Sequence, residues 1–471
     1  MRTTSFVSDE GWSSLPAQTR SRPSGSRHLR RTIHYRSRRL RRNRLTRTPV
    51  FAGRRLRAAI EHTDEWTFCP AALGRKVSDV PLGLEAHAVG KTTRLKFGEL
   101  FCGPGGIGWA AKTVRVETED GRVFELEHAW ATDYDRDSCK TYARNILPDK
   151  QHAVVCEDIR ELDLERLAAI EKDIDVLAFG FPCNDFSIVG ERKGINGKYG
   201  PLYKYSVAAV RRFRPKWFFA ENVGGLRNSN EGEAFRLILK EFADLGYRLY
   251  PHLYKFEEYG VPQKRHRIVI IGIDRNEPVS FEVPAPIYTD ESQFVSVEEA
   301  LKDIPEWASN QEPTRHAPHV LERLKYIREG ENAFTAAHRM PEHLRLKVNG
   351  AKLSHIYRRL DRKKPSYTIT GSGGGGTHVY HWEENRALTN RERARIQTFR
   401  DDFVFFGNKE SVRKQIGMAV PPQGALVILE AVLKSYAGIP YPSVPPNLMH
   451  YLEELPTREQ AKLLLEPVAA H

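Results

Sequence analysis

The chain has 471 residues, of which 40% are hydrophobic and 10% aromatic, enough for two or three domains with real cores. Its five cysteines stand far apart without a C-x-x-C pair, which argues against a disulfide framework and a structural zinc site. The apolar runs are too short to cross a bilayer, and the first residues lack the apolar segment of a secretory signal. We therefore expect an intracellular protein without a membrane segment or a metal.

The net charge of +13 is concentrated near the N-terminus. Residues 1–60 hold sixteen arginines, no lysine and two acids, a charge of +14, which leaves about −1 for the other 411 residues. This Arg- and Ser-rich composition predicts a stretch that is disordered in isolation. A nucleic-acid-binding arm, an organelle transit peptide and a tail without a role all fit it. The total charge therefore does not identify a DNA-binding protein.

Short apolar runs alternate with helical patterns from residue 94 onward. Strands are predicted at 95–101, 128–132, 153–155, 176–181, 217–220 and 268–273, and helices at 136–145, 162–170, 203–213 and 233–245. This alternation predicts an α/β fold with a largely parallel sheet covered on both faces. Seven prolines interrupt the rhythm in 276–355, and helices are predicted again at 389–397 and 424–435.

A glycine-rich turn, Phe101-Cys102-Gly103-Pro104-Gly105-Gly106, ends the first predicted strand and opens a helix. Glycines there allow a tight turn and a close approach of a ligand to the helix N-terminus. The next two strands end in Asp133, followed by Tyr134, and in Asp158, followed by Ile159. In such folds the first acid holds ribose hydroxyls, while an aromatic ring can stack on adenine and a further acid can bind its amino group. These strand ends predict a nucleotide-type cofactor site.

Two further strand ends carry a thiol and a carboxylic acid. Gly180-Phe181-Pro182-Cys183-Asn184 follows the apolar run 175–179, and Glu221-Asn222-Val223 follows the run 216–220. The carboxyl ends of parallel strands meet at one edge of a sheet, where open α/β sheets collect their chemistry. A free cysteine is ordinarily a small buried hydrophobe, but a thiol beside an acid suits attack on an electron-poor ring. Cys183 and Glu221 are therefore candidate catalytic residues.

Six motifs, in this order, resemble the motif series of the DNA cytosine-5 methyltransferases. They are 100–106, 180–183, 221–223, Gln263-Lys264-Arg265-His266-Arg267, the pair Arg359-Leu360-Asp361 and Pro365-Ser366-Tyr367-Thr368-Ile369, and Gln415-Ile416-Gly417-Met418-Ala419-Val420-Pro421-Pro422. The resemblance covers residues 94–436. It implies a Rossmann-like sheet that binds S-adenosylmethionine, with a smaller target-recognition region, acting on cytosine in double-stranded DNA.

The resemblance also implies roles for four catalytic residues. The Cys183 thiolate adds to carbon 6 of cytosine, which turns carbon 5 into an enamine carbon that can attack the sulfonium methyl group. Glu221 hydrogen-bonds or protonates ring nitrogen 3, which a raised pKa would favour. Arg267 binds the ring carbonyl oxygen, and Arg265 helps to hold it or the DNA backbone. Because a stacked base hides carbon 6, the cytosine must be flipped out of the duplex.

DNA contacts are expected from two stretches besides the catalytic residues. Arg192 and Lys193 lie in a basic, glycine-containing loop soon after the nucleophile, which predicts a lid that closes over DNA. Residues 276–355 carry nine basic residues against thirteen acids, so recognition there is expected from a few side chains that reach base edges. Residues 356–400 carry ten against four, and we expect phosphate contacts from Arg359 and Lys363.

One residue departs from the family pattern. Met418 stands where the family usually carries Asn, in a turn close to the cofactor, so we expect it to change cofactor affinity or the stability of that turn. The expected segments are a basic extension (1–93), a catalytic core (94–275), a target-recognition and DNA-contacting region (276–405), a return to the core (406–439) and a tail (440–471).

We therefore expect a monomeric DNA cytosine-5 methyltransferase that uses S-adenosylmethionine. In a bacterium it would be cytoplasmic and nucleoid-associated, with a restriction endonuclease for the same site as a hypothetical partner; in a eukaryote it would be nuclear or organellar. A transfer-RNA cytosine-5 methyltransferase and a DNA-binding regulator with a disabled active site are the alternatives. The long recognition region argues against the first, and the presence of all four catalytic residues argues against the second.

Overall fold

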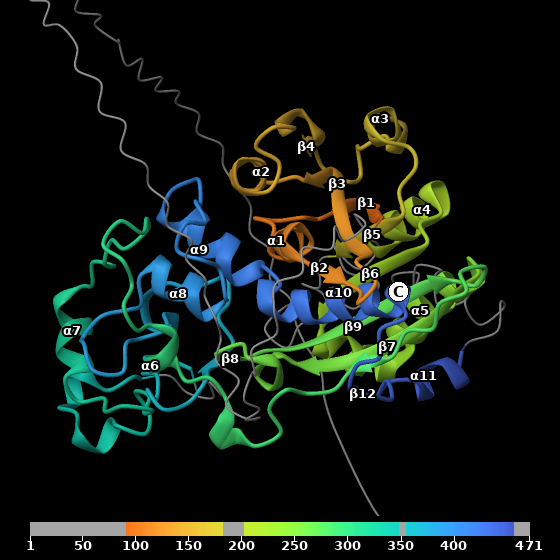
Figure 1. Cartoon of the computed structure of the whole chain (residues 1–471). Coiled ribbons are helices and arrows are strands. Elements are labelled where there is room, and N and C mark those ends of the chain that lie inside the picture. Colours follow the sequence, from red (N-terminus) through yellow and green to blue (C-terminus); the bar gives the residue numbers. More distant parts are fainter. Residues whose placement is uncertain (1–90, 182–201, 348–354, 456–471) are drawn as a thin grey trace, which may run out of the picture. The chain divides into compact units, whose positions relative to one another are not determined.

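The computed structural model describes residues 91–181, 202–347 and 355–455, all within one compact unit, Leu84–His471 (Figure 1). An eight-stranded sheet runs through this unit in the order β2-β3-β1-β5-β6-β9-β7, with β4 beside β3. Its strands are β1 (Thr92–Leu100), β2 (Arg115–Glu117), β3 (Val123–Asp133), β4 (Val154–Cys156), β5 (Val176–Gly180), β6 (Trp217–Val223), β7 (Tyr247–Lys255) and β9 (His266–Asp274).

The sheet is parallel at its centre and antiparallel at its two sides. The pairs β1–β3, β1–β5, β3–β4 and β5–β6 are parallel, whereas β9 runs antiparallel to β6 and β7, and β2 antiparallel to β3. The predicted α/β fold is confirmed. The sequence reasoning missed β2 and β7.

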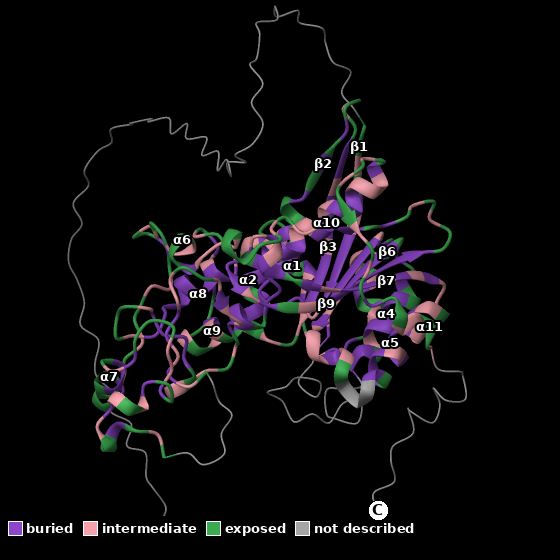
Figure 2. Ribbon diagram, turned by 90° about the horizontal axis from the view of Figure 1, so that it is seen from below, coloured by how far each residue is buried: buried purple, intermediate pink, exposed green. Residues whose placement is uncertain are grey.

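Helices cover both faces of this sheet. On one face lie α2 (Arg136–Asn145), α3 (Leu164–Ile170), α4 (Tyr203–Phe213) and α5 (Glu233–Asp244), and on the other α1 (Gly106–Thr113) and α10 (Pro422–Ala437). Side chains alternate between the two cores, as in any strand: Leu177 and Phe179 of β5 pack in the first, and Val176 and Ala178 in the second. The central strands are accordingly buried (Figure 2).

The order of the strands locates the switch point of the fold. After β1, the chain adds β3 and β4 on one side of this strand and then β5 and β6 on its other side. In open α/β sheets a crevice forms where the strand order reverses in this way, outside the carboxyl ends of the strands. The glycine-rich turn follows β1, and the Pro-Cys motif follows β5, so both predicted motifs leave the sheet at this crevice.

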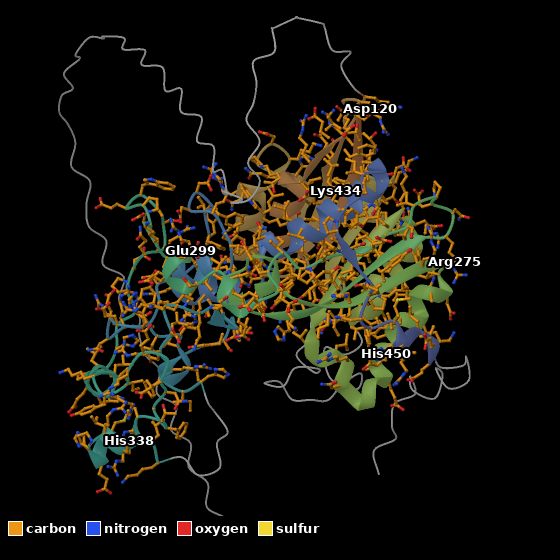
Figure 3. All side chains as sticks on the ribbon, turned by 60° about the horizontal axis from the view of Figure 1, so that its bottom comes forward. Asp120, Arg275, Glu299, His338, Lys434 and His450 are labelled. Atoms are coloured by element: carbon orange, nitrogen blue, oxygen red, sulfur yellow. The ribbon has the colours of Figure 1, made fainter. Side chains whose placement is uncertain are left out.

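A smaller region follows β9 and has hydrophobic clusters of its own, one of which contains Leu324, Met340, Tyr357 and Tyr380. Between β9 and α10 the chain forms β10 (Val283–Pro284), α6 (Val297–Ala300), α7 (Pro318–Leu324), β11 (Ser366–Tyr367), α8 (Asn390–Ile396) and α9 (Lys409–Met418). Figure 3 labels Glu299 and His338 on this region and Lys434 on α10. The strand β11 runs parallel to β8 (Gln263–Lys264), which precedes β9.

The C-terminal segment packs on the core as far as it is described. β12 (Ser443–Val444) pairs with β10, and Tyr451 of α11 (His450–Glu453) stacks edge-on against Phe235 with ring centroids 5.0 Å apart. The part of the expected tail up to residue 455 is therefore bound to the core. The stretch Lys409–Ala437 is long and apolar enough to cross a membrane, but 72% of its apolar window is buried and α10 packs against the sheet, as a core helix does.

Candidate active site

The carboxyl ends of β5 and β6 lie side by side. Gly180 is in register with Glu221, and a Cβ atom added to Gly180 would come 3.2 Å from Oε2 of Glu221. The side-chain amide of Asn222 donates to the carbonyl of Phe181 at 3.2 Å and so joins the two strand ends. The carboxylate therefore faces the strand from which Cys183 follows three residues later.

Three residues of the expected site fall outside the described ranges. They are the nucleophile Cys183 and the two lid residues Arg192 and Lys193. Their roles stay predictions.

Glu221 forms a largely buried ion pair with Arg267. Nε of Arg267 lies 2.9 Å from Oε1 of Glu221, and the two side chains are 11% and 13% exposed. The pair forms because β6 and β9 run antiparallel, with Val223 opposite Arg267. Burial raises the pKa of the Glu221 carboxyl, while the charges of Arg267 and Arg265 oppose that rise. A carboxyl group tuned in this way can hold a proton close to a ring nitrogen.

Arg265 has a different place from the one expected. Its side chain is buried and donates to the carbonyls of Ile369 (3.0 Å), Gly417 (3.1 Å) and Ala419 (2.9 Å). The expected role, to help hold the ring carbonyl oxygen or the DNA backbone, stays a prediction, and the guanidinium lies inside the protein. Arg265 joins the catalytic strand to two segments that follow more than one hundred residues later.

The glycine-rich turn is fixed by the acid that ends β3. Oδ2 of Asp133 accepts from the backbone of Gly103, and Oδ1 accepts from that of Asp135, both at 2.9 Å. A Cβ atom on Gly106 would come 2.0 Å from the carbonyl of Val420, so only glycine fits there. The ribose contact expected of Asp133 is untested, but its carboxylate shapes the turn that would receive the cofactor.

The other cofactor candidates lie around this turn in different environments. Tyr134 is 61% exposed, and its hydroxyl accepts from Nζ of Lys414 in α9 at 3.1 Å. Met418 is 56% exposed, whereas Ile159 is buried. Asp158 binds the guanidinium of Arg160, with Nε 2.9 Å from Oδ1, so an adenine amino group would share this carboxylate with a cation.

This surrounding fits S-adenosylmethionine. Among residues 91–181, 202–347 and 355–455, no atom lies within 4 Å of a Cβ atom added to Gly103, so the described part of the chain leaves space beside the turn. The exposed ring of Tyr134 offers a surface for stacking. Lys414, which holds that ring, was missed by the sequence reasoning, since nothing but its charge sets it apart in α9.

Of the two expected phosphate-binding residues, only Lys363 is exposed. Arg359 is 3% exposed, and its guanidinium donates to backbone carbonyls of Leu324, Ile327, His381 and Glu384 at 2.6 to 3.0 Å. These bonds give Arg359 a structural role inside the smaller region, and its expected contact with DNA stays a prediction. The contact expected of Lys363 stays a prediction.

A buried pair of glutamines was also missed. Nε2 of Gln263 donates to Oε1 of Gln397 at 2.5 Å, and Oε1 of Gln263 accepts from the backbone of Ile369 at 2.8 Å. Gln397 in turn donates to the carbonyl of Ala419 at 2.7 Å. This chain of bonds runs beside Arg265 and joins the same segments. Its signal in the sequence was the glutamine that opens the motif 263–267.

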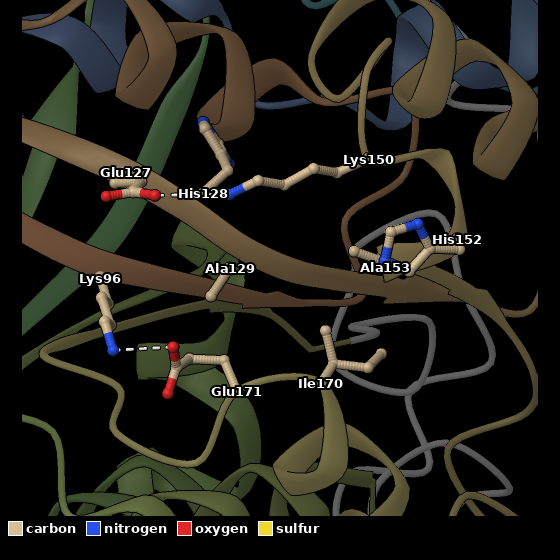
Figure 4. A pocket seen from close by; sticks show the side chains of 9 residues that line it. All are labelled: Lys96, Glu127, His128, Ala129, Lys150, His152, Ala153, Ile170 and Glu171. Atoms are coloured by element: carbon tan, nitrogen blue, oxygen red, sulfur yellow. Dashed lines mark hydrogen bonds and ion pairs between the residues drawn. The ribbon is translucent and has the colours of Figure 1, made fainter.

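A cavity of about 230 Å³ lies at the middle of β1 and β3, away from their carboxyl ends (Figure 4). Its charged side chains are paired: Nζ of Lys96 lies 2.7 Å from Glu171, and Nζ of Lys150 lies 3.3 Å from Glu127. We assign this cavity no part in the reaction.

Comparisons with known proteins agree with this site. A family model for C-5 cytosine-specific DNA methylases matches residues 95–434. The type II methyltransferase M.BbvI of Brevibacillus brevis is 57% identical over 355 residues, covering 74% of this chain and 94% of that protein. M.NgoFVII of Neisseria gonorrhoeae, also a type II methyltransferase, is 37% identical over 346 residues, covering 72% and 86%.

A solved structure shares the fold. A prophage protein of Escherichia coli, named as a DNA modification methyltransferase, superposes with a TM-score of 0.56 at 22% identity, covering 73% of this chain and 99% of that one. The family match spans most of the chain and contains the four catalytic candidates. The chain therefore belongs to the C-5 cytosine-specific DNA methylases and is a DNA (cytosine-5-)-methyltransferase.

Proposed function

We propose that this enzyme methylates carbon 5 of a flipped cytosine in a specific duplex sequence, through a covalent adduct with Cys183. The observation that carries the proposal is the buried pair of Glu221 and Arg267, beside the strand that leads to Cys183. A thiolate, an acid and a guanidinium are the three groups that the addition to a cytosine ring requires.

The chemistry divides among these side chains. The thiolate of Cys183 adds to carbon 6, and the electrons of the carbon 5–carbon 6 double bond move toward ring nitrogen 3. Glu221 stabilises the charge there by donating a proton, which suits a carboxyl group whose pKa burial raises. Arg267 donates to the carbonyl oxygen at carbon 2. Loss of the proton from carbon 5 after methylation then expels the thiolate.

S-adenosylmethionine, when bound, supplies the electrophilic methyl group. We propose that it is held by the turn Phe101–Gly106, by the acids Asp133 and Asp158, by Ile159 and by the exposed side chains of Tyr134 and Met418. The open space beside Gly103 and the exposed Tyr134 ring support this placement. Arg160 would release part of its hold on Asp158 to admit an adenine amino group.

The setting of the reaction follows from the relatives. Both M.BbvI and M.NgoFVII are named type II methyltransferases, which supports a partner restriction endonuclease that cuts the same sequence. We propose that the enzyme acts as a cytoplasmic monomer on double-stranded DNA. We also propose 94–275 and 406–439 as the catalytic core and 276–405 as the recognition and DNA-contacting region.

The proposal is tested by expressing the enzyme and its Cys183→Ala variant in a bacterium without cytosine-5 methylation. Sequencing of plasmid DNA should show 5-methylcytosine at one short sequence with the parent and none with the variant. A duplex with 5-fluorocytosine at that site should form an adduct that survives denaturing electrophoresis, since fluorine cannot leave as a proton does.

Three outcomes would contradict the proposal. Full activity of Cys183→Ala would rule out the covalent route. Methylation of transfer RNA without methylation of duplex DNA would favour the RNA enzyme. No 5-methylcytosine, with folded protein present, would favour the regulator.

A further inference from the structure

Arg393 of α8 is a buried cation without a visible counterpart. The residue is 2% exposed, and its guanidinium forms no hydrogen bond or ion pair within 91–181, 202–347 and 355–455. Burial lowers its pKa to about 10, which still leaves the group charged at neutral pH. An unpaired buried charge is among the most unfavourable features that a folded protein can contain.

Two neighbouring side chains each have a buried nitrogen without a hydrogen-bond partner. Nε of Arg413 in α9 and Nδ1 of His378 are both buried and unbonded within the described part of the chain. Ala394 of α8 packs with Val412 of α9 in one hydrophobic cluster, and a Cβ atom on Gly373 would lie 3.6 Å from Nε of Arg413 and 3.8 Å from the carbonyl of Thr377, which precedes His378. In keeping with this placement, burial lowers the pKa of His378 to about 4, and the charges of Arg393 and Arg413 contribute to that change. We call Arg393, Arg413 and His378 the cationic cluster.

The acids near the cationic cluster do not neutralise Arg393. The carboxylate of Glu392 is bound to the guanidinium of Arg386 at 2.7 and 2.8 Å. Glu410 lies 3.9 Å from Arg413, but its side chain is 82% exposed. Lys409 adds a further positive charge nearby, with Nζ bound to a backbone carbonyl. The cluster thus keeps an excess of positive charge and of unbonded donors.

The glycine tract 371–376 lies over α9 at this place. A Cβ atom on Gly373 would come 3.6 Å from Nε of Arg413, and one on Gly371 would come 2.9 Å from the carbonyl of Lys414. No atom lies within 4 Å of a Cβ atom on Gly374. A cover built from glycine leaves room for a ligand to approach the backbone closely.

We propose that the cationic cluster binds one phosphate of the DNA backbone, with Arg393 as the principal ligand. The inference rests on the proposed function, in which duplex DNA is the substrate. A phosphate supplies both the acceptor oxygens and the negative charge that the cluster lacks, and it suits the planar fork of a guanidinium. A base edge would supply acceptors but no charge, so it would leave Arg393 uncompensated.

The test compares Arg393→Met with the parent and with Arg211→Met, a control that removes an exposed cation from α4. Each protein is titrated with a duplex that carries the methylated sequence, over a range of salt concentrations. In Arg393→Met the dissociation constant should rise roughly tenfold or more. The slope of log K against log salt should fall in magnitude by about 0.9, the loss of one phosphate contact. The control should match the parent in both measurements.

Two further measurements separate this role from a structural one. Without DNA, Arg393→Met should melt at the parent's temperature or above it, because an unpaired buried charge has been removed. Arg393→Lys should keep the parent's salt slope and lose affinity only. Replacement of single phosphates in the duplex by uncharged methylphosphonates should weaken DNA binding by the parent at one position. At that position the same replacement should not change the affinity of Arg393→Met.

The outcomes that would overturn the inference are distinct from a failure of the proposed function. If the parent methylates and binds DNA but Arg393→Met has an unchanged salt slope, the phosphate site is wrong and the methyltransferase stands. The same holds if Arg393→Met melts several degrees lower with unchanged DNA affinity. A parent that methylates no duplex would refute the proposed function itself.

Discussion

At the carboxyl edge of the sheet the guanidinium of Arg267 is paired with a carboxylate, whereas in the region of α8 and α9 the guanidinium of Arg393 has no such partner among the described residues. The side chain of Arg267 is 11% exposed, and Arg393 is 2% exposed. A paired cation can bind a neutral ring without adding net charge to its site, while an unpaired one favours an anion. Under the two proposals, the first region would bind the cytosine ring and the second a phosphate of the DNA backbone.

The largest expected effect tests the first region. Glu221→Gln keeps the shape of the side chain but cannot hold an acidic proton, so kcat for DNA methylation should fall by about 10² to 10⁴-fold. Affinity for duplex DNA should stay within about threefold of the parent's, because Arg267 remains. Single-turnover kinetics and a DNA titration measure the two quantities. A variant that kept the parent's kcat would show that Glu221 has no part in proton transfer.

Arg359 is buried like Arg393, but its donors are bound to backbone carbonyls, so we expect it to stabilise the fold and not to bind DNA. Arg359→Met removes the donors for four buried carbonyls, so the free energy of unfolding should fall by about 3–5 kcal/mol. The salt slope of DNA binding should not change at temperatures where the variant is folded. Urea denaturation is the measurement, and Lys363→Met, at an exposed position, should change stability by about 0.5 kcal/mol or less. A reduced salt slope in Arg359→Met would restore its predicted role in DNA binding.

The last prediction concerns a buried carboxyl group, that of Glu99, which is neutral and has no cation beside it in the described part of the chain; its effect is small near pH 5 and grows with pH. Burial raises the pKa of Glu99, under the cofactor turn, to about 8, and its Oε2 accepts from the hydroxyl of Tyr142 at 2.8 Å. Between about pH 4.5 and 8 the folded protein holds a proton that the unfolded chain releases. Stability therefore falls as the pH rises through this window, by up to about 1.4 kcal/mol per pH unit.

Glu99→Gln removes this proton linkage. Thermal melting should show the variant close to the parent near pH 5 and more stable than the parent near pH 8. A difference between the two proteins that does not depend on pH would contradict a protonated Glu99.

Sequence reasoning found the strand ends but not the burial of the arginines. Glu221 and the cofactor turn were predictable because parallel strands bring their carboxyl ends to one edge, whatever the rest of the chain does. Arg265, Arg359 and Arg393 were not, because their surroundings come from segments far away in the chain. Helix α8 reads as a solvated helix rich in arginine, yet Nε of Arg391 donates to the carbonyl of Ser309 at 2.9 Å. The charge of a short segment does not show that residues far away in the chain will bury its side chains.

The short pair of β8 and β11 has a consequence for how such enzymes diversify. Gln263 lies opposite Ser366, and the hydroxyl of Thr368 donates to the carbonyl of Lys264 at 2.7 Å, so the returning chain pairs with the short strand that precedes β9. The described residues between β10 and β11, 285–347 and 355–365, are also bound to later segments, for example by Nζ of Lys409, which donates to the carbonyl of Pro313. None of these bonds involves the pair of Glu221 and Arg267. On the proposed division of the chain, an exchange of this stretch between relatives would therefore change the sequence preference without a new catalyst.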